Sequence, residues 1–369
     1  MFVYLFNLYF VLIMLYVSRV ISISAIELNW KRTSNLYGVN NYFVFLAFCS
    51  MFLIAALRHN VGTDYNEYVI LFNSIATSQD SASFGFHIEP IFVLLSKTIA
   101  IFSDNPVWIF ISTSFFITYF VFKASIKSTN LYEFAIFLFI AFGFYTSSLN
   151  VIRQWMAASV LLYGYTFLAD KQHKAFFKCV LLACCCHYSA LVILPVYLFI
   201  HKTRNDITRI CIMFIGVILF YNTNQIITLL QTVSMNIAFF NKYYKYLILN
   251  EEIGGSVFVL PMFCLITYAL YAFVKRSNKQ MTNAVEIYMN ILAVGFVFSL
   301  IGQKLMTFSR LQFFFVIVLI IIIPQLAWLL KKQERTLFYL ACILIGSIFL
   351  VYSLNKNGGD PLPYQTIFS

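Results

Sequence analysis

Apolar runs of helix length recur along almost the whole chain, and short clusters of Lys and Arg separate them. Such runs predict helices that cross a membrane, because a helix needs about 20 apolar residues to span the hydrocarbon core. The clearest candidates are residues 2–17, 41–57, 107–122, 131–148, 155–169, 208–222, 257–274, 286–301, 311–330 and 336–353. The opening run lacks a basic start and a small-residue cleavage site, so we expect it to be retained as the first span.

Two further segments fit more than one topology. Residues 89–103 are short for a span, and residues 175–200 form either one long helix or a tight hairpin broken near His187. A re-entrant segment at 89–103 together with a hairpin at 175–200 places most Lys and Arg residues in the cytoplasm, whereas the opposite pair of choices nearly removes that bias. The sequence therefore predicts an all-α, polytopic transmembrane bundle of about twelve spans plus a re-entrant segment, with both termini outside.

Composition agrees with a membrane protein. The chain is 61% hydrophobic and 11% charged, and its apolar runs are too long for the alternating strands of a membrane barrel. The net charge of +11 comes from short basic clusters between spans, which is typical of membrane topology and argues against a nucleic-acid partner. Without repeats or linker-like segments, residues 1–369 are predicted to form a single integral membrane domain with outer loops at about 58–88 and 223–256.

Three arginines stand at predicted outer ends of spans, where the charge bias disfavours them. They are Arg58 in "LRHNVGTDYNEYVILF", Arg153 in "SSLNVIRQWMAAS" and Arg310 in "FSRLQFFF". Guanidinium groups bind phosphates bidentately, and the helix N-terminus predicted at Arg153 favours a bound anion. We expect the three to converge on an anionic substrate. The alternatives are an interface anchor for Arg58 and, for Arg153, a surface position on a helix that Asn150 caps.

Two acids and one histidine are the candidates for proton transfer on the same face. Glu89 precedes a proline and is expected just before the first turn of the re-entrant helix, where a carboxylate is costly and hence a functional candidate. Asp64 lies in the loop after Arg58, and His187 lies at the predicted break in "CCCHYSALVILP". The alternatives are helix capping for Glu89 and hydrogen-bonded packing for His187, with His59 and His87 as rival bases.

Polar neighbours of these groups are candidates for substrate binding: Tyr65, Tyr68, Gln154 and Ser189. Aromatic residues make up 19% of the chain, and they suit both anchoring at the membrane surface and stacking on sugar rings. Residues 236–250 are expected to lie in the interface as an amphipathic helix. The chain has no nucleotide-binding glycine loop and no zinc motif, so no cofactor and no metal is expected.

In this order the motifs resemble the EpsG family of bacterial polysaccharide polymerases, which overlaps in function with the Wzy-type polymerases of O-antigen and capsule. The resemblance is carried by "RHNVGTDYNEY", "IEPIF", "NVIRQWMAAS", "HKAFFKCVLLACCCHYSALVILPVYLF" and "FSRLQFFF", over roughly residues 40–330. It implies a GT-C-like helical fold in the bacterial inner membrane. It also implies a glycosyltransferase that joins oligosaccharide units carried on undecaprenyl diphosphate at the periplasmic face, working with a separate chain-length regulator.

The resemblance suggests a division of roles among the candidates. Arg58, Arg153 and Arg310 are expected to bind the donor diphosphate, and His187 to act as a base or phosphate contact. Asp64 or Glu89 is expected to activate the acceptor hydroxyl. Two alternatives remain open, namely a ligase that transfers finished glycan to a lipid core and a transporter that flips lipid-linked sugars.

Overall fold

The computed structural model describes residues 1–27, 34–78, 88–202, 205–236, 259–277 and 281–369. The helices are α1 (Phe2–Glu27), α2 (Ser34–Ala56), α3 (Tyr65–Thr77), α4 (Pro90–Ala100), α5 (Val107–Ser128), α6 (Tyr132–Ala141), α7 (Phe144–Ser147), α8 (Ile152–Ala169), α9 (His173–Cys186), η2 (Tyr188–Val192), α10 (Ile193–Ile200), α11 (Asp206–Tyr221), α12 (Thr223–Asn236), α14 (Val259–Ser277), α15 (Asn283–Ile301), α16 (Met306–Leu311), α17 (Phe313–Val316), α18 (Leu319–Trp328) and α19 (Lys332–Lys356). In the described part of the chain the fold is all-α, as predicted.

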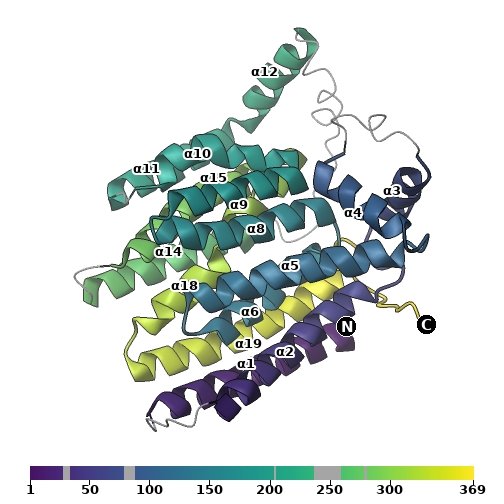
Figure 1. Ribbon diagram of the computed structural model, residues 1–369. Helices are drawn as coiled ribbons and strands as arrows, with labels where there is room; N and C mark the ends of the chain where they lie inside the picture. The colour runs from purple at the N-terminus through teal and green to yellow at the C-terminus, as the bar shows by residue number, and fades with distance from the viewer. Residues whose placement is uncertain (28–33, 79–87, 203–204, 237–258, 278–280) are drawn as a thin grey trace.

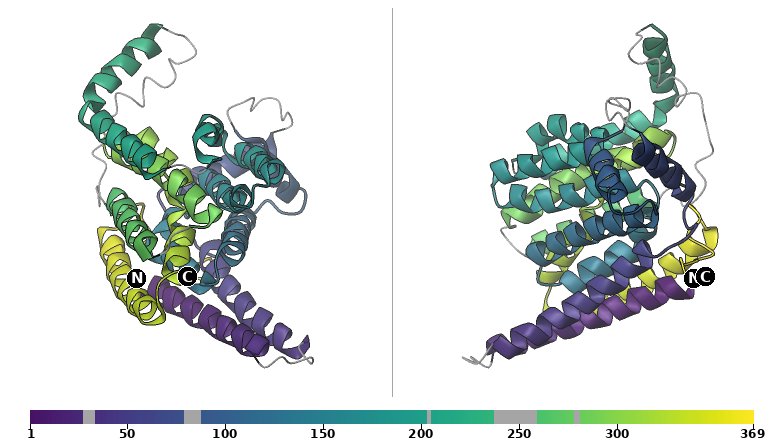
Figure 2. Two further views of the ribbon diagram at one scale, coloured as in Figure 1. Left: turned by 90° about the vertical axis from the view of Figure 1, so that its left-hand side faces the viewer. Right: turned by 45° about the vertical axis from the view of Figure 1, so that its right-hand side comes forward.

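The long helices pack side by side in one bundle. α1 contacts α2, α2 contacts α5, α5 contacts α8 and α8 contacts α9, while α15 packs against α11, α14 and α17. α1, α2 and α19 lie along one side of the bundle, and α9 to α11 lie along the opposite side (Figure 1, Figure 2). Both termini lie at the same end as α3 and α4, which fits the expectation that they share one face of the membrane.

The number of spans differs from the expectation of about twelve. Among the described residues, six helices are long and apolar enough to cross a membrane, and a bent pair formed by α11 and the start of α12 raises the number to seven. Some expected spans are shorter apolar helices, such as Tyr132–Ala141. The span expected at 131–148 breaks after α6 because Gly143 adopts φ +76°, a left-handed conformation that ends the helix. The protein is a multi-pass membrane protein, and its described residues contain fewer full-length candidate spans than the sequence predicted.

Both segments that were ambiguous in the sequence have short helices. α4 has 11 residues, so it rises about 16 Å and is too short to cross the hydrocarbon core. The 175–200 region is a hairpin, because the hydroxyl of Tyr197 in α10 lies 3.0 Å from Nδ1 of His173 at the start of α9. The tip of this hairpin is His187, as the sequence predicted.

Candidate functional site

The carboxylate of Glu89 holds two other candidate residues together. One of its oxygens pairs with the guanidinium of Arg153, and the other lies 2.5 Å from Nδ1 of His187. The Glu89 side chain is only 4% exposed, whereas those of Arg153 and His187 are 25% and 27% exposed. The three residues come from α4, α8 and the hairpin tip, so the fold assembles a charged cluster from segments far apart in the sequence.

Each member stands at the end of a helix. Glu89 is the N-cap of α4, with extended backbone and Pro90 in the first turn, as predicted. His187 joins α9 to η2 in extended backbone. Arg153 lies in the first turn of α8. A helix end lets a side chain leave the packed bundle while its backbone stays fixed.

Burial by itself would raise the pKa of the Glu89 carboxyl. The hydrogen bond from His187 and the positive charge of Arg153 outweigh that effect, so the pKa of Glu89 lies below its ordinary value. Glu89 is therefore ionised at neutral pH, and an ionised carboxylate only accepts hydrogen bonds. Nδ1 of His187 must then be the donor, which leaves Nε2 available to a substrate.

The start of α8 contains a strained residue. The N-cap is Val151, not Asn150 as the sequence suggested, and Val151 adopts φ +30° and ψ +45°, a left-handed conformation unusual for a β-branched residue. Its backbone N–H donates to a carboxylate oxygen of Asp64 over 3.0 Å. Such strain persists only where surrounding contacts hold it and is common at functional sites. Asp64 thus orients the turn that presents Arg153.

Asn150 instead ties together three segments. Its side-chain oxygen accepts from the hydroxyl of Thr63 at 3.1 Å, and its amide donates to the carbonyl of Gly359 at 2.8 Å. Gly62 and Gly359 both have positive φ and approach this amide so closely that a Cβ would lie 2.8 Å and 2.6 Å from it. The C-terminal segment therefore lies against the loop after α2. Sequence reasoning considered Asn150 only as a cap, because its partners are more than 80 residues away.

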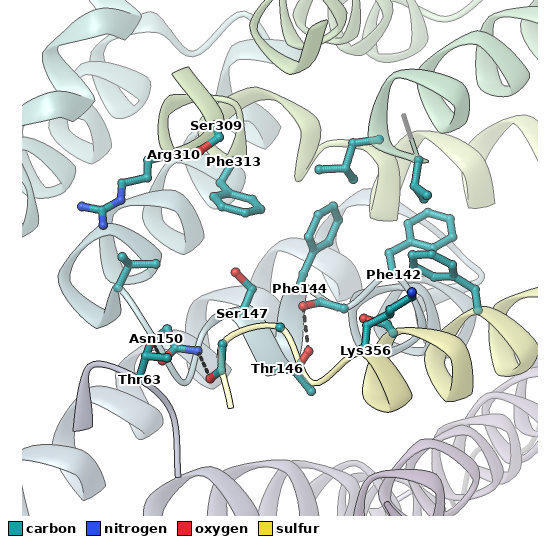
Figure 3. A pocket seen from close by; sticks show the side chains of 18 of the residues that line it. Thr63, Phe142, Phe144, Thr146, Ser147, Asn150, Ser309, Arg310, Phe313 and Lys356 are labelled. Atoms are coloured by element: carbon teal, nitrogen blue, oxygen red, sulfur yellow. Dashed lines mark hydrogen bonds between the residues drawn. The ribbon is translucent and has the colours of Figure 1, made fainter. Parts of the chain in front are cut away.

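Two neighbouring cavities open at the end of the bundle where the Glu89 cluster lies. The smaller, of about 100 Å³, is lined by Asp64, Tyr68, Val151, Arg153, Gln154, His187 and Arg310. The larger, of about 440 Å³, shares Asp64, Val151 and Arg310 with it and is bounded further by α7, α14, α16, α19 and the C-terminal segment (Figure 3). Arg310 is exposed, and none of the described carboxylates pairs with it. Its backbone carbonyl accepts from the Gln154 amide at 2.5 Å.

Arg58 does not join the other two arginines. It is buried, and its guanidinium donates to the backbone carbonyls of Ala55 and Leu149, the latter at 3.1 Å, and lies 4.9 Å from the Phe110 ring centre. Arg58 lines neither of the two cavities. Of the three arginines expected to converge, only Arg153 and Arg310 do so, because the two terminal nitrogens of Arg58 donate to carbonyls at the end of α2 and just after α7.

Of the four residues expected to bind substrate, Tyr68 and Gln154 line the smaller cavity. Tyr65 is buried against Phe110, with ring centres 4.4 Å apart, and does not line it. The hydroxyl of Ser189 is buried and has no hydrogen-bond partner among the described residues.

Some expectations fall outside what the structure describes or tests. His87, residues 237–250 and much of both expected outer loops lie outside the described residues. Within the described ranges no three His, Cys, Asp or Glu side chains come together as metal ligands would. That no metal or cofactor takes part stays a prediction.

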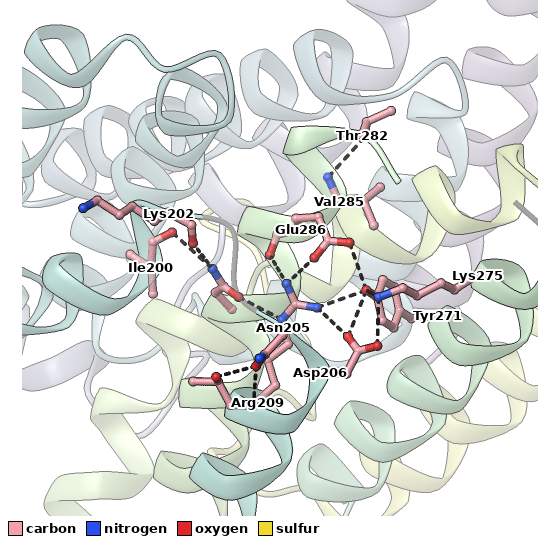
Figure 4. A network of polar contacts seen from close by, with 12 residues as sticks. Ile200, Lys202, Asn205, Asp206, Arg209, Tyr271, Lys275, Thr282, Val285 and Glu286 are labelled. Carbon is pink, nitrogen blue, oxygen red and sulfur yellow. Dashed lines mark hydrogen bonds and ion pairs between the residues drawn. The ribbon is translucent and has the colours of Figure 1, made fainter. Parts of the chain in front are cut away.

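A second polar cluster lies where the N-terminal parts of α11 and α15 meet the C-terminal part of α14 (Figure 4). Arg209 is fully buried there and pairs with Asp206 at 2.9 Å and with Glu286, while Tyr271 and Asn290 accept further hydrogen bonds from it. All three of its nitrogens have partners, and the cluster lines none of the described cavities. It is a structural link between three helices.

The chain matches a known protein family over most of its length. The EpsG family model matches residues 41–366, which include the Glu89 cluster, both cavities and the C-terminal segment. The chain belongs to the EpsG family. Neither a curated protein nor a solved structure matches it, so the expected GT-C-like fold stays a prediction. Family membership implies a part in exopolysaccharide synthesis and leaves the reaction to be argued from the site.

Proposed function

We propose that this EpsG-family chain is a glycosyltransferase that joins oligosaccharide units carried on undecaprenyl diphosphate into a polysaccharide, at the periplasmic face of the bacterial inner membrane. The observation that carries the proposal is the Glu89 cluster: a nearly buried carboxylate holds a guanidinium and an imidazole beside a cavity that Arg310 also lines. This arrangement supplies a base and two cations to one small space.

The transfer exchanges one glycosidic bond for another. A hydroxyl of the incoming unit attacks the anomeric carbon of the growing chain, the bond from that carbon to the diphosphate oxygen breaks, and its electron pair leaves with the diphosphate. The proton of the hydroxyl passes to Nε2 of His187. No external energy source is needed because the diphosphate is itself the leaving group, which agrees with a sequence that has no nucleotide-binding loop.

Arg153 and Arg310 are the proposed contacts to the departing diphosphate. Negative charge grows on that group as the bond breaks, and fixed guanidinium donors stabilise it without having to reorganise. Glu89 orients Arg153 and His187 and so acts as a positioning residue, while Asp64 positions the turn before Arg153. In this scheme Arg58 has a structural role and does not bind the diphosphate.

The experiment uses a strain that lacks the gene, complemented with wild type, Arg153→Ala or a control, with surface glycan resolved on a gel. Arg276→Ala is the matched control because Arg276 is an exposed arginine at the C-terminal end of α14. Wild type and the control are expected to give a ladder, and Arg153→Ala a single repeat unit at equal protein level. Absence of even the single unit in the deletion strain would instead indicate a ligase or flippase.

A further inference from the structure

The larger cavity contains a cation that the transfer step does not use. Arg310 stands at the end shared with the Glu89 site, and Lys356 stands at the opposite end beside Phe142 (Figure 3). Lys356 is exposed, and no carboxylate among the described residues forms an ion pair with it. Its ammonium lies 5.7 Å from the Tyr352 ring centre. The two ends of the cavity therefore offer two separate points of positive charge.

Helix chemistry explains part of this placement. Lys356 is in the last turn of α19, where any cation interacts favourably with the helix dipole. That effect accounts for a lysine in the turn but not for its direction, because a side chain pointing into solvent would satisfy it equally. Lys356 instead forms part of the cavity wall.

The wall around Lys356 is apolar. Phe142 stacks on Phe263 at 4.2 Å, and Phe263 meets Phe349 at 5.4 Å. The adjoining helices are the most outward-facing of the candidate spans, since only 28% of the apolar stretch of α14 and 17% of that of α19 is buried. A cation beside an apolar wall on the lipid side of a cavity matches an amphiphile that has an anionic head and a hydrocarbon chain.

The middle of the cavity has a different lining. The hydroxyls of Ser147 and Ser309 and the rings of Phe144 and Phe313 lie between the two charged ends (Figure 3). Hydroxyl groups with flat aromatic surfaces suit sugars, which present both polar edges and apolar faces. The cavity thus changes from a lipid-headgroup lining to a sugar lining along its length and ends at the proposed transfer site.

We infer that the larger cavity is the acceptor subsite, with Lys356 holding the diphosphate of the incoming lipid-linked unit. The sugars of that unit run along the cavity, and their terminal hydroxyl reaches His187. The donor diphosphate, held by Arg153 and Arg310, is a second and separate ligand. This assignment rests on the proposed function, since only a reaction between two lipid-linked chains needs two diphosphate sites.

The test is equilibrium binding of radiolabelled polyprenyl diphosphate to the full chain in nanodiscs. Wild type is expected to bind at two sites, and Lys356→Ala to lose one of them, with affinity there falling about ten-fold or more. Lys356→Arg should keep both sites because it keeps the charge. Lys332→Ala is the matched control, since Lys332 is an exposed lysine at the other end of α19. Arg153→Ala should keep the Lys356-dependent site.

Competing ligands identify the source of the anion. Excess inorganic pyrophosphate should displace the lipid from the Lys356-dependent site only weakly, because it lacks the apolar chain. Displacement as strong as by unlabelled lipid would overturn the lipid assignment, and a Lys356→Ala isotherm identical to that of wild type would overturn the subsite. Two lipid sites in a protein that makes no ladder would contradict the proposed polymerase and leave the Lys356 site standing.

Discussion

Replacing Glu89 with Gln tests how the cluster works while changing its shape very little. The amide is nearly isosteric with the carboxylate but carries no charge, and it accepts hydrogen bonds through one oxygen only. Arg153 and His187 would then compete for that oxygen, and the partner left without it would face the NH₂ group. Glu89→Gln is therefore expected to misorient His187 and to leave the charge of Arg153 uncompensated.

The magnitude follows from burial. Glu89 is 4% exposed, and each hydrogen bond to a charged group contributes about 1.5–3 kcal/mol. Arg153 and His187 are about one quarter exposed, so water replaces part of what they lose. We expect a loss of about 2–3 kcal/mol. If the same amount is lost from the transition state, the transfer rate falls about 30- to 150-fold.

The assay measures initial rates of chain extension by purified protein supplied with lipid-linked repeat units, beside thermal unfolding of each variant. Glu67→Gln is the control, because Glu67 is an exposed acid on α3 near the same end of the bundle. The control should match wild type in both measurements. A Glu89→Gln protein that extends chains at the wild-type rate would refute the positioning role of the carboxylate.

Three further predictions concern stability. Arg58→Ala should lower the free energy of unfolding by about 2–4 kcal/mol, since it leaves buried carbonyls unpaired, and an unchanged Tm would contradict this. Arg209→Ala should cost about 3–5 kcal/mol by stranding the carboxylate of Glu286, whereas a fully stable variant would show that the network is not needed. Because the pKa of Glu89 is lowered from 4.5, its ion pairs stabilise the fold above that pH and are lost as the pH falls through the lowered pKa. The Tm difference between wild type and Glu89→Gln should therefore shrink as the pH falls below 4.5 and vanish in acid, and a difference that grows in acid would reverse the sign of this argument.

Local signals in the sequence predicted several parts of the site. A Glu before a Pro predicted the N-cap of α4, and the break around His187 predicted a hairpin tip, because both depend on neighbouring residues. The placement of Arg153 in the first turn of α8 was likewise local. These are features that capping and helix-breaking residues determine without long-range contacts.

Long-range contacts explain what the sequence did not show. An arginine at a span end looks the same whether it faces a cavity, as Arg310 does, or donates to carbonyls inside the bundle, as Arg58 does. Lys356 went unnoticed because a lysine near a helix C-terminus is ordinary, although a lysine on the predicted outer face was a weak signal. The described residues contain fewer full-length candidate spans than expected, in part because apolar runs do not show where a helix breaks, as at Gly143.

The most direct test of the central claim is reconstitution. Purified wild-type and Arg153→Ala proteins would be placed in liposomes with lipid-linked repeat units as the only substrate, and the products resolved by length. The account predicts a ladder of polymers and released lipid diphosphate with wild type, and unextended single units with Arg153→Ala. Wild-type protein that moves the units across the bilayer without lengthening them would contradict it.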